Sequence, residues 1–239
     1  NQVETRDSPA STLVAGSANP QAAVTVNGQA PTRQNRFYAL LLNRDNEEAH
    51  WKSVRVEGRI PSAGTRGSDA VAEEAGFLPL PPKPQRFTYD ADGNLLSDDL
   101  WTYRWNAENR LVEMTSRLSS EPNQPPRQRL TFIYDSEGRR IAKTVFHWNT
   151  ETETWEQHSQ SVFLYDGWNL LAELKTENRT LKTSTKWFVW GLDLSGSPQG
   201  AGGVGGLLAV HDGEEAALPI YDGNGNIHAY VDAATDQTL

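Results

Sequence analysis

The sequence predicts an all-β protein, in which antiparallel β-hairpins repeat to form one sheet and a small β-domain precedes that sheet. Three observations lead to this prediction. Aromatic and β-branched residues, which suit the pleated surface of a sheet, alternate with polar residues along most of the chain. Turn signals made of Asp, Asn and Gly separate the alternating runs. A motif of Tyr-Asp, usually followed by Gly, recurs, whereas heptads rich in Ala and Leu, which would predict long helices, are absent from the sequence.

The composition excludes several classes of partner. The 239 residues carry a net charge of −9 without a large cluster of Lys and Arg, so we expect no nucleic-acid partner. There is no run of 18 apolar residues and no basic, apolar signal peptide, so we expect neither a membrane span nor a signal within this chain. The sequence contains no Cys, which excludes disulfides and thiolate zinc sites. Because it begins at Asn1 rather than Met, we interpret it as part of a longer chain.

The chain divides into four predicted segments. Residues 1–23 are rich in Ser, Ala, Asn and Pro and lack periodicity, which is typical of a flexible lead-in. A small β-sandwich-like domain follows over 24–57. A Gly/Pro-rich linker is predicted over 58–85, because Pro removes the backbone donor that a strand needs; within it, AVAEEAG is compatible with one helical turn. The repeat sheet occupies 86–239.

The small domain is predicted to hold three or four antiparallel strands. Val24 and Val26 alternate with polar residues and run into Asn27-Gly28, a strong hairpin signal because both residues accept a positive φ. The apolar run FYALLL and the alternating run WKSVRVEG supply the remaining strands.

The repeat sheet is predicted from a unit that recurs after residue 86. Each copy has aromatic or branched residues, then Tyr-Asp, then usually Gly, then a second alternating apolar run. The Tyr-Asp pairs begin at residues 89, 134, 165 and 221. Recurrence of one supersecondary unit indicates hairpins that lie side by side and share a continuous core.

The residue types of the unit fit a three-residue hairpin loop. The Asp90 carboxylate can accept backbone N–H groups two residues on, and Gly93 supplies the left-handed conformation of the loop. The Tyr ring is expected to pack on the neighbouring hairpin while its hydroxyl reaches a polar group. The segment NAENRL looks like a degenerate form of the same turn, with Asn109 in place of Gly. The predicted turn residues are Tyr89, Asp90, Gly93, Asn94, Tyr134, Asp135, Gly138, Tyr165, Asp166, Tyr221, Asp222, Gly225 and Asn226.

These residues resemble a known family. The segments YDADGNL, WTYRWNAENRLVEM, FIYDSEGRRIAK and YDGNGNIHAYVD are similar to the YD repeats of bacterial Rhs proteins, of the C components of insecticidal toxin complexes and of teneurins. The resemblance covers residues 86–239, and 24–57 looks like the small β-domain that precedes the repeats in some members. It implies a structural scaffold, a β-sheet ribbon that forms part of a β-shell around a C-terminal toxin or effector.

The resemblance also implies partners and a location. The partners would be the chain's own C-terminal effector segment or the remaining repeats of the full-length protein, which would be secreted or on the cell surface of a bacterium. The family's core continues into an arginine-rich segment and a self-cleaving D-P-x-G-x-x-G end, which this sequence, ending at Leu239, does not contain. Self-cleavage is therefore not carried over, and with four or five repeats we expect an open, curved sheet. The segment GLDLSGSPQGAGGVGGLLA resembles a structural crossing in this family.

We expect no enzyme active site, no cofactor and no metal site. The acidic turns do not fit a helix–loop–helix calcium loop, because counting from Asp90 places Gly93 at position 4 and Trp101 at position 12. The His residues lack metal-binding spacing, and no G-x-S-x-G motif occurs. Acidic residues that could serve glycoside hydrolysis, among them Asp98 and Asp193, are candidates only by type.

A carbohydrate-binding or cell-surface adhesion module is the alternative function. Aromatic faces stack on sugar rings as readily as they fill cores, and exposed aromatic patches mark binding sites. The candidates for glycan stacking are Trp101, Trp105, Trp187 and Trp190. Most Trp side chains are nevertheless expected to pack within the sheet.

Overall fold

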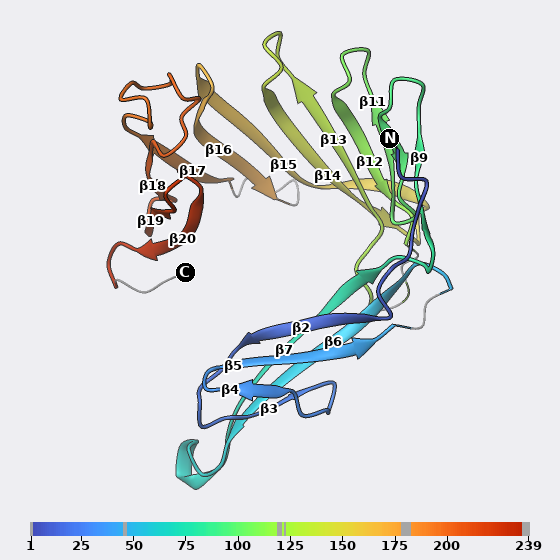
Figure 1. The fold of residues 1–239 in the computed structure, drawn as a ribbon, viewed down its shortest axis with the longest axis vertical. Helices are drawn as coiled ribbons and strands as arrows, with labels where there is room; N and C mark the ends of the chain where they lie inside the picture. Colours follow the sequence, from blue (N-terminus) through green and yellow to red (C-terminus); the bar gives the residue numbers. More distant parts are fainter. Residues whose placement is uncertain (1, 45–46, 119–120, 122, 178–182, 236–239) are drawn as a thin grey trace. The chain divides into compact units, whose positions relative to one another are not determined.

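The computed structural model describes residues 2–44, 47–118, 121, 123–177 and 183–235. Among them the all-β prediction is confirmed, because the regular elements are antiparallel strands apart from one short 3-10 turn, η1 (Thr65–Gly67) (Figure 1). The chain separates into two compact units, which we describe in turn. Unit 1 comprises residues 1–103 and 115–127, and unit 2 comprises residues 104–114 and 128–239.

Unit 1 contains two three-stranded sheets, with strand orders β2-β5-β4 and β3-β6-β7, and a two-stranded pair of β1 with β8. These strands are β1 (Thr5–Arg6), β2 (Ser11–Ser17), β3 (Ala23–Val26), β4 (Thr32–Gln34), β5 (Phe37–Asn43), β6 (His50–Ile60), β7 (Ala70–Leu80) and β8 (Gln85–Arg86). Val24, Val26, Leu42 and Leu80 are buried, and Val26 has no exposed surface. The small β-domain therefore includes strands from both of the segments that flank 24–57.

The structure differs from the predicted lead-in over 1–23, because this segment contains ordered strands. β2 pairs with β5 along its whole length, with Leu13 opposite Leu41 and Ala15 opposite Ala39. Ser, Ala and Gly make up much of β2, so its own sequence shows little alternation. The partner strand, which is apolar, fixes its position.

The structure also differs from the predicted linker over 58–85. β7 lies in this segment and pairs with β6 from Ile60↔Ala70 to His50↔Leu80, so AVAEEAG is strand rather than a helical turn. The long alternating strand β6 offers a row of backbone donors and acceptors, and pairing with them satisfies the polar groups of β7. The Pro-rich run that follows Leu80 ends the strand, because Pro lacks the N–H that a ladder needs.

The Asn27-Gly28 signal produces a tight turn, although not the expected hairpin. Both residues have positive φ, 48° and 76°, and the Val26 and Gln29 backbones exchange hydrogen bonds of 2.8 and 2.9 Å. β3 nevertheless pairs with β6, which is distant in sequence. The Asn27 side chain fixes this arrangement, because its Oδ1 accepts from Arg55 N at 2.8 Å and its Nδ2 donates to the Ser53 carbonyl at 3.1 Å.

The other strands form one twelve-stranded antiparallel sheet, in which strand order follows the sequence. They are β9 (Thr88–Tyr89), β10 (Leu95–Ser97), β11 (Trp101–Trp105), β12 (Leu111–Ser116), β13 (Gln128–Tyr134), β14 (Arg140–Asn149), β15 (Thr154–Asp166), β16 (Asn169–Glu177), β17 (Thr183–Trp190), β18 (Leu207–His211), β19 (Ala216–Tyr221) and β20 (Ile227–Asp232). Figure 1 shows β13 to β17 side by side. Each strand pairs with the next, so the sheet is a series of hairpins, as the recurring unit predicts.

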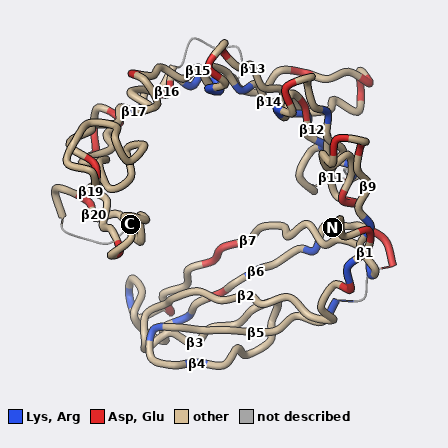
Figure 2. Tube along the Cα trace, turned by 45° about the horizontal axis from the view of Figure 1, so that its top comes forward, with Lys and Arg blue, Asp and Glu red and all other residues tan. Residues whose placement is uncertain are grey.

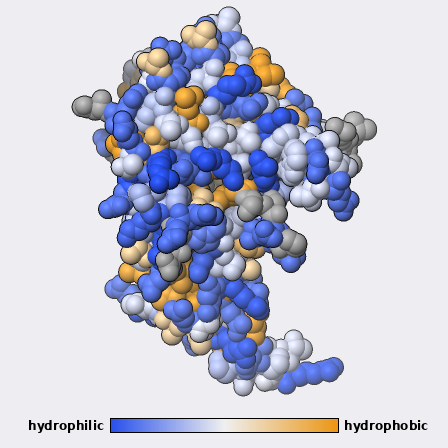
Figure 3. Space-filling view, turned by 90° about the vertical axis from the view of Figure 1, so that its right-hand side faces the viewer, coloured by the Kyte–Doolittle hydropathy of each residue, from blue (hydrophilic) through white to orange (hydrophobic). Residues whose placement is uncertain are grey.

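The part of this sheet that belongs to unit 2 has little buried core. Its buried hydrophobic residues, two of them alanines, are Phe132, Ala142, Ala172 and Leu207. Val162, Leu164 and Trp187 are 39% to 47% exposed. In the space-filling view, hydrophobic residues form separate orange patches among hydrophilic ones (Figure 3). The sheet therefore depends strongly on its hydrogen bonds.

In unit 1, we expect Val26→Ala to lower the free energy of unfolding by about 2 kcal/mol, because it removes two methyl groups from a fully buried site. Urea unfolding followed by far-UV circular dichroism measures the change. Val71→Ala is the matched control, since Val71 is 53% exposed and its truncation should change stability by less than about 0.5 kcal/mol. Equal losses for the two variants would contradict this assignment of the core.

Candidate functional site: the hairpin turns of the repeat sheet

The sequence-predicted Asp residues organise the turns of the repeat sheet. Asp90, Asp135 and Asp222 each use Oδ1 to accept the backbone N–H groups of the residues two and four positions on, at 2.8 to 3.0 Å. The backbone carbonyl of each Asp accepts the N–H of the Gly three positions on, at 3.1 to 3.2 Å. Red segments mark acidic residues at the turns of this sheet in Figure 2. One carboxylate thus satisfies turn donors that the strands cannot reach.

The glycines of these turns occupy the left-handed region of backbone conformation. Gly93, Gly138 and Gly225 have φ of 90°, 87° and 80°. A side chain is strained at such angles, which is why Gly follows the Asp at this offset. In the degenerate turn, Asn109 takes this place with φ of 57°, and the Asn106 side chain accepts from Glu108 N and Arg110 N at 3.0 Å.

The residue four positions after the Asp closes each turn with its side chain. Asn94 Nδ2 donates to Asp90 Oδ2 at 3.0 Å, and Asn226 Nδ2 donates to Asp222 Oδ2 at 2.9 Å. These hydrogen bonds from the Asn side-chain amides are the largest cause of the lowered pKa of the Asp90 and Asp222 carboxyls. The turns therefore hold their carboxylates ionised and bonded within the loop.

Arg139 has the same position in the turn that begins at Asp135. Its Nε donates to Asp135 Oδ2 at 2.7 Å. Desolvation raises the pKa of the Asp135 carboxyl, but the hydrogen bonds from Arg139 and Glu137 outweigh it, so the net shift is downward.

The turn at Asp166 is shorter than the others. Asp166 stands directly opposite Asn169 in the ladder, so the loop consists of Gly167 and Trp168. Gly167 has φ of 54°. Of the predicted turn aspartates, Asp166 is the one that is followed by a two-residue loop instead of the common three-residue loop.

The tyrosines of the motif connect neighbouring hairpins. Tyr134 Oη donates to the Leu111 carbonyl at 2.9 Å, Tyr165 Oη to the Arg140 carbonyl at 3.1 Å, and Tyr221 Oη to the Leu207 carbonyl at 2.7 Å. In unit 1, Tyr89 Oη donates to the Val3 carbonyl at 3.1 Å. The ladder shifts register beside Tyr134, Tyr165 and Tyr221, which is the effect of a bulge next to the turn.

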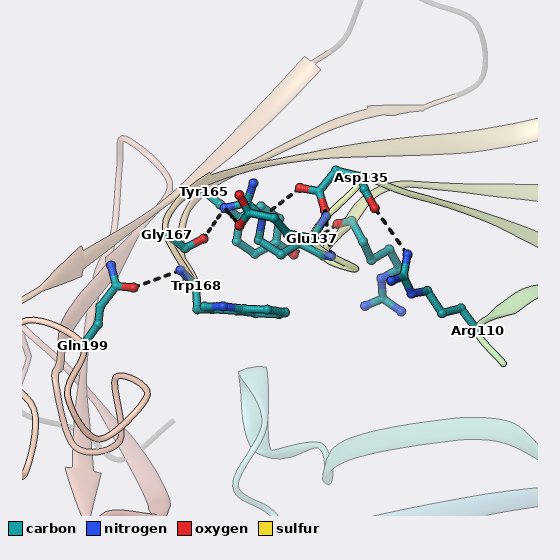
Figure 4. Close-up of polar contacts among 9 residues, drawn as sticks. Arg110, Asp135, Glu137, Tyr165, Gly167, Trp168 and Gln199 are labelled. Carbon is teal, nitrogen blue, oxygen red and sulfur yellow. Dashed lines mark hydrogen bonds and ion pairs between the residues drawn. The ribbon is translucent and has the colours of Figure 1, made fainter. Parts of the chain in front are cut away.

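Arginines that the sequence analysis did not single out link one turn to the next (Figure 4). Arg110 lies over the Tyr134 ring, 5.9 Å from its centroid, and its Nη1 donates to the Asp135 carbonyl at 3.3 Å. Arg139 lies over the Tyr165 ring at 5.6 Å and donates to the Gly167 carbonyl at 2.5 Å. The signal in the sequence was an Arg directly after the turn in both ENRL and EGRR. We use the name turn ladder for the hydrogen bonds and ring contacts of the turn Asp carboxylates, the motif Tyr residues and these arginines.

Gln199 extends the turn ladder from the glycine-rich loop. Its Oε1 accepts from Trp168 N at 3.0 Å (Figure 4). Its Nε2 donates to the Asp166 carbonyl at 2.8 Å. A Cβ on Gly167 would lie 2.3 Å from Gln199 Oε1, and a Cβ on Gly138 would lie 2.9 Å from Arg110 Nη2. Both glycines therefore allow a close approach of the linking side chain as well as a positive φ.

Asp193 organises the glycine-rich loop between β17 and β18. Its buried carboxylate accepts from Ser195 N and Oγ at 2.9 and 2.6 Å through Oδ1, and from Ala201 N and Gly203 N at 2.6 and 3.1 Å through Oδ2. The Ser195 hydroxyl is the largest cause that lowers the pKa of this carboxyl to about 2. Because its acceptor positions are taken within the loop, Asp193 is placed as a structural carboxylate.

The four Trp candidates for glycan stacking differ in exposure. Trp101 and Trp105 lie on β11 and are half-buried. Trp190 on β17 is also half-buried, and its Nε1 donates to the Leu170 carbonyl at 2.7 Å. Trp187, on the same strand, is 46% exposed, and Trp168 in the Asp166 turn is 60% exposed. The structure therefore leaves Trp187 and Trp168 as the accessible indole surfaces among these residues.

Two kinds of site do not occur among the residues that the structure describes. No group of three or more His, Asp or Glu side chains is arranged to hold a metal ion. No helix within the described ranges is long and apolar enough to span a membrane.

Comparison with known proteins gives partial sequence matches. No family model matches the chain. A stretch of 103 residues, 42% of the chain, is 31% identical to the tRNA3(Ser)-specific nuclease WapA of Bacillus spizizenii and to the tRNA nuclease WapA of Bacillus subtilis. This stretch spans about 4% of the length of those relatives.

Solved structures resemble the chain at low TM-scores. TcdB2-TccC3 is 10% identical and has a TM-score of 0.41, and the match covers 84% of this chain and 12% of that one. A protein of unknown function from Bacteroides fragilis is 15% identical with a TM-score of 0.32, and the match covers 65% of this chain and 88% of that one.

For the turn ladder, we expect Tyr134→Phe to lower the free energy of unfolding of the repeat sheet by about 1 kcal/mol, because the Leu111 carbonyl loses its donor. Urea unfolding monitored by tryptophan fluorescence measures the loss. Tyr230→Phe in β20 is the matched control and should change stability by less than about 0.5 kcal/mol. If Tyr134→Phe is as stable as the wild type, the hydroxyl does not hold the hairpins together.

For Asp193, we expect a contribution to stability that is lost in acid. The pKa of this carboxyl is lowered from 3.8 to about 2 in the folded protein, so the unfolded chain binds the proton more readily. The stabilisation is present above the unfolded pKa of 3.8 and is lost as the pH falls through the folded pKa of about 2. Asp193→Asn should be less stable than the wild type at pH 7, and the difference should shrink between pH 4 and pH 2 in thermal unfolding experiments. Glu151→Gln, in an exposed turn, is the matched control.

Proposed function

We propose that this chain is a structural scaffold, part of a β-shell in a YD-repeat (Rhs-type) protein, whose sheet encloses or presents a C-terminal toxin or effector segment. The turn ladder is the observation that supports this proposal most directly. Its carboxylates, hydroxyls and guanidinium groups bond to backbone atoms of their own turn or of a neighbouring hairpin. Side chains used in this way build a sheet and leave few polar groups free for catalysis.

The partial sequence match gives independent support for a carrier role. The WapA proteins are named as tRNA nucleases, and this chain matches about 4% of their length. The matched stretch is a small part of those relatives. In this chain the repeat sheet is a series of hairpins linked at their turns, and we propose that such a sheet holds an effector. We therefore propose no enzymatic activity, no cofactor and no metal for this chain, and a place in a secreted or cell-surface protein.

A glycan-binding role is the second candidate, and the exposure of Trp187 and Trp168 favours it. Both indoles offer faces to solvent, and an aromatic face can stack on a sugar ring. The two functions differ in what these side chains do: a scaffold tolerates their removal, whereas a glycan site loses its ligand.

Limited proteolysis of the full-length protein tests the scaffold. We expect trypsin to cleave the effector segment more slowly in the full-length protein than in the isolated segment. Arg139→Gln, which removes the bonds of Arg139 to Asp135 and Gly167, should speed cleavage. Arg104→Gln is the matched control, because the Arg104 side chain is 67% exposed and pairs with Glu113 at the surface. Equal cleavage rates for the segment alone and within the full-length protein would contradict the proposal.

A glycan array tests the alternative. We expect no saturable signal for the wild type, and none that Trp187→Ala or Trp168→Ala removes. A signal that is lost in Trp187→Ala, and kept in the control Trp190→Ala if that variant folds, would favour the glycan-binding role over the scaffold.

A further inference from the structure

Two imidazole rings stack between β14 and β15. His147 and His158 lie with ring centroids 4.0 Å apart and an interplanar angle of 14°. Both side chains are half-buried. The stack therefore brings two titratable groups into van der Waals contact across the hairpin, at a position where most cross-strand pairs in proteins are apolar or oppositely charged.

A bulge places His158 against His147. Val145 pairs with Ser159 and Phe146 pairs with Gln157, so His158 is the extra residue of β15. A bulge redirects a side chain and leaves the ladder locally weaker. Beyond it, the hairpin continues through His147↔Glu156 to Asn149↔Thr154. We call residues 146–149 and 154–157 the far end of the hairpin. The stack lies where this far end joins the rest of the sheet.

The charged groups of β15 and β16 near the stack have other partners. Glu156 stands opposite His147 in the ladder, and its Oε1 accepts from Asn149 Nδ2 at 2.8 Å. Glu177 of β16 stands opposite Ser159, beside His158, and pairs with Lys175 at 2.5 Å. The ion pair with Lys175 therefore offsets the charge of Glu177, and the hydrogen bond from Asn149 holds Glu156 Oε1 against the Asn149 amide.

The groups of β13 add no negative charge to the stack. Gln128, opposite His147, brings its Nε2 to 3.5 Å from His147 Nε2. Arg129 stands opposite Phe146 and lies over the Phe146 and Trp155 rings, 4.7 and 5.1 Å from their centroids. Arg127, just before this strand, is also cationic. Desolvation and the charge of His158 together lower the pKa of His147, which agrees with this setting.

We propose that the His147–His158 stack is an acid-sensitive contact, which joins β14 and β15 while the rings are neutral and separates the far end of the hairpin when both are protonated. Neutral rings stack through dispersion and the desolvation of their faces. Two imidazolium ions at this separation repel each other. Their repulsion opposes the contacts that hold the hairpin beyond the bulge, which include the edge-on contact of Trp148 with Trp155 at 5.2 Å between ring centroids and the hydrogen bond of Asn149 to Glu156. The readout is therefore local: residues 146–149 and 154–157 exchange their amide hydrogens faster in acid, whereas β15–β16 pairing stays intact.

Hydrogen exchange of the full chain at pH 7.4 and pH 5.0 tests this proposal, with rates corrected for intrinsic exchange. We expect protection in residues 146–149 and 154–157 to fall at pH 5.0, by about tenfold for each pKa unit by which the two charged rings repel each other. His158→Gln should abolish this fall. His228→Gln, on the exposed strand β20, is the matched control and should keep it. An equal fall in His158→Gln, or no fall in the wild type, would overturn the proposal.

An NMR titration of the wild-type imidazole rings provides a test that does not depend on the folding of a variant. If the rings are coupled, the pair binds its protons in two macroscopic steps, and the pKa of His147 lies below that of an isolated imidazole. A single-step titration of His147 with the pKa of an isolated imidazole would likewise overturn the proposal.

Discussion

The repeat sheet depends on how the hairpin turns satisfy their own backbone groups. A turn interrupts the ladder and leaves N–H and C=O groups without strand partners, and such groups are costly unless something bonds them. In unit 2 this requirement is acute, because alanines make up half of the buried hydrophobic residues of the sheet. The Asp135 carboxylate bonds the backbone N–H of Arg139 inside one turn. The Arg139 guanidinium bonds this carboxylate and also the Gly167 carbonyl of the next turn. Local hydrogen bonds therefore supply stability that a protein with a larger hydrophobic core obtains from the burial of apolar side chains.

The same bonds explain why a polar, aromatic motif can build a scaffold. Tyr134 and Tyr165 each contribute a ring on which an Arg of the preceding hairpin lies and a hydroxyl that bonds a carbonyl of that hairpin. A repeated pair of this kind extends the sheet one hairpin at a time, so stability accumulates from neighbour to neighbour. The proposed acid-sensitive His147–His158 stack departs from this rule, because it is a contact between two titratable rings at a bulge of the hairpin.

Much of the turn chemistry could be predicted from the sequence, because it is local. Asp90, Gly93 and Asn94 lie within five consecutive residues, and the geometry of their loop follows from the φ that Gly accepts and the atoms that a carboxylate can reach. The partner of Arg110 could not be predicted in the same way. It is 25 residues away, and only the pairing of hairpins brings the Asp135 carbonyl to it.

The sequence by itself determined that the protein is all-β and that Tyr-Asp units form hairpins, because alternation and turn residues act over a few positions. Tertiary structure alone decided the roles of β2 and β7, which lie in segments that lacked a strand pattern of their own. Ser, Ala and Gly in β2 become a strand because β5 offers a complete edge, and β7 follows β6 for the same reason. A strand such as β2 or β7 is specified by backbone hydrogen bonds to its partner and not by its own side-chain pattern. Its position therefore could not be predicted from its own sequence.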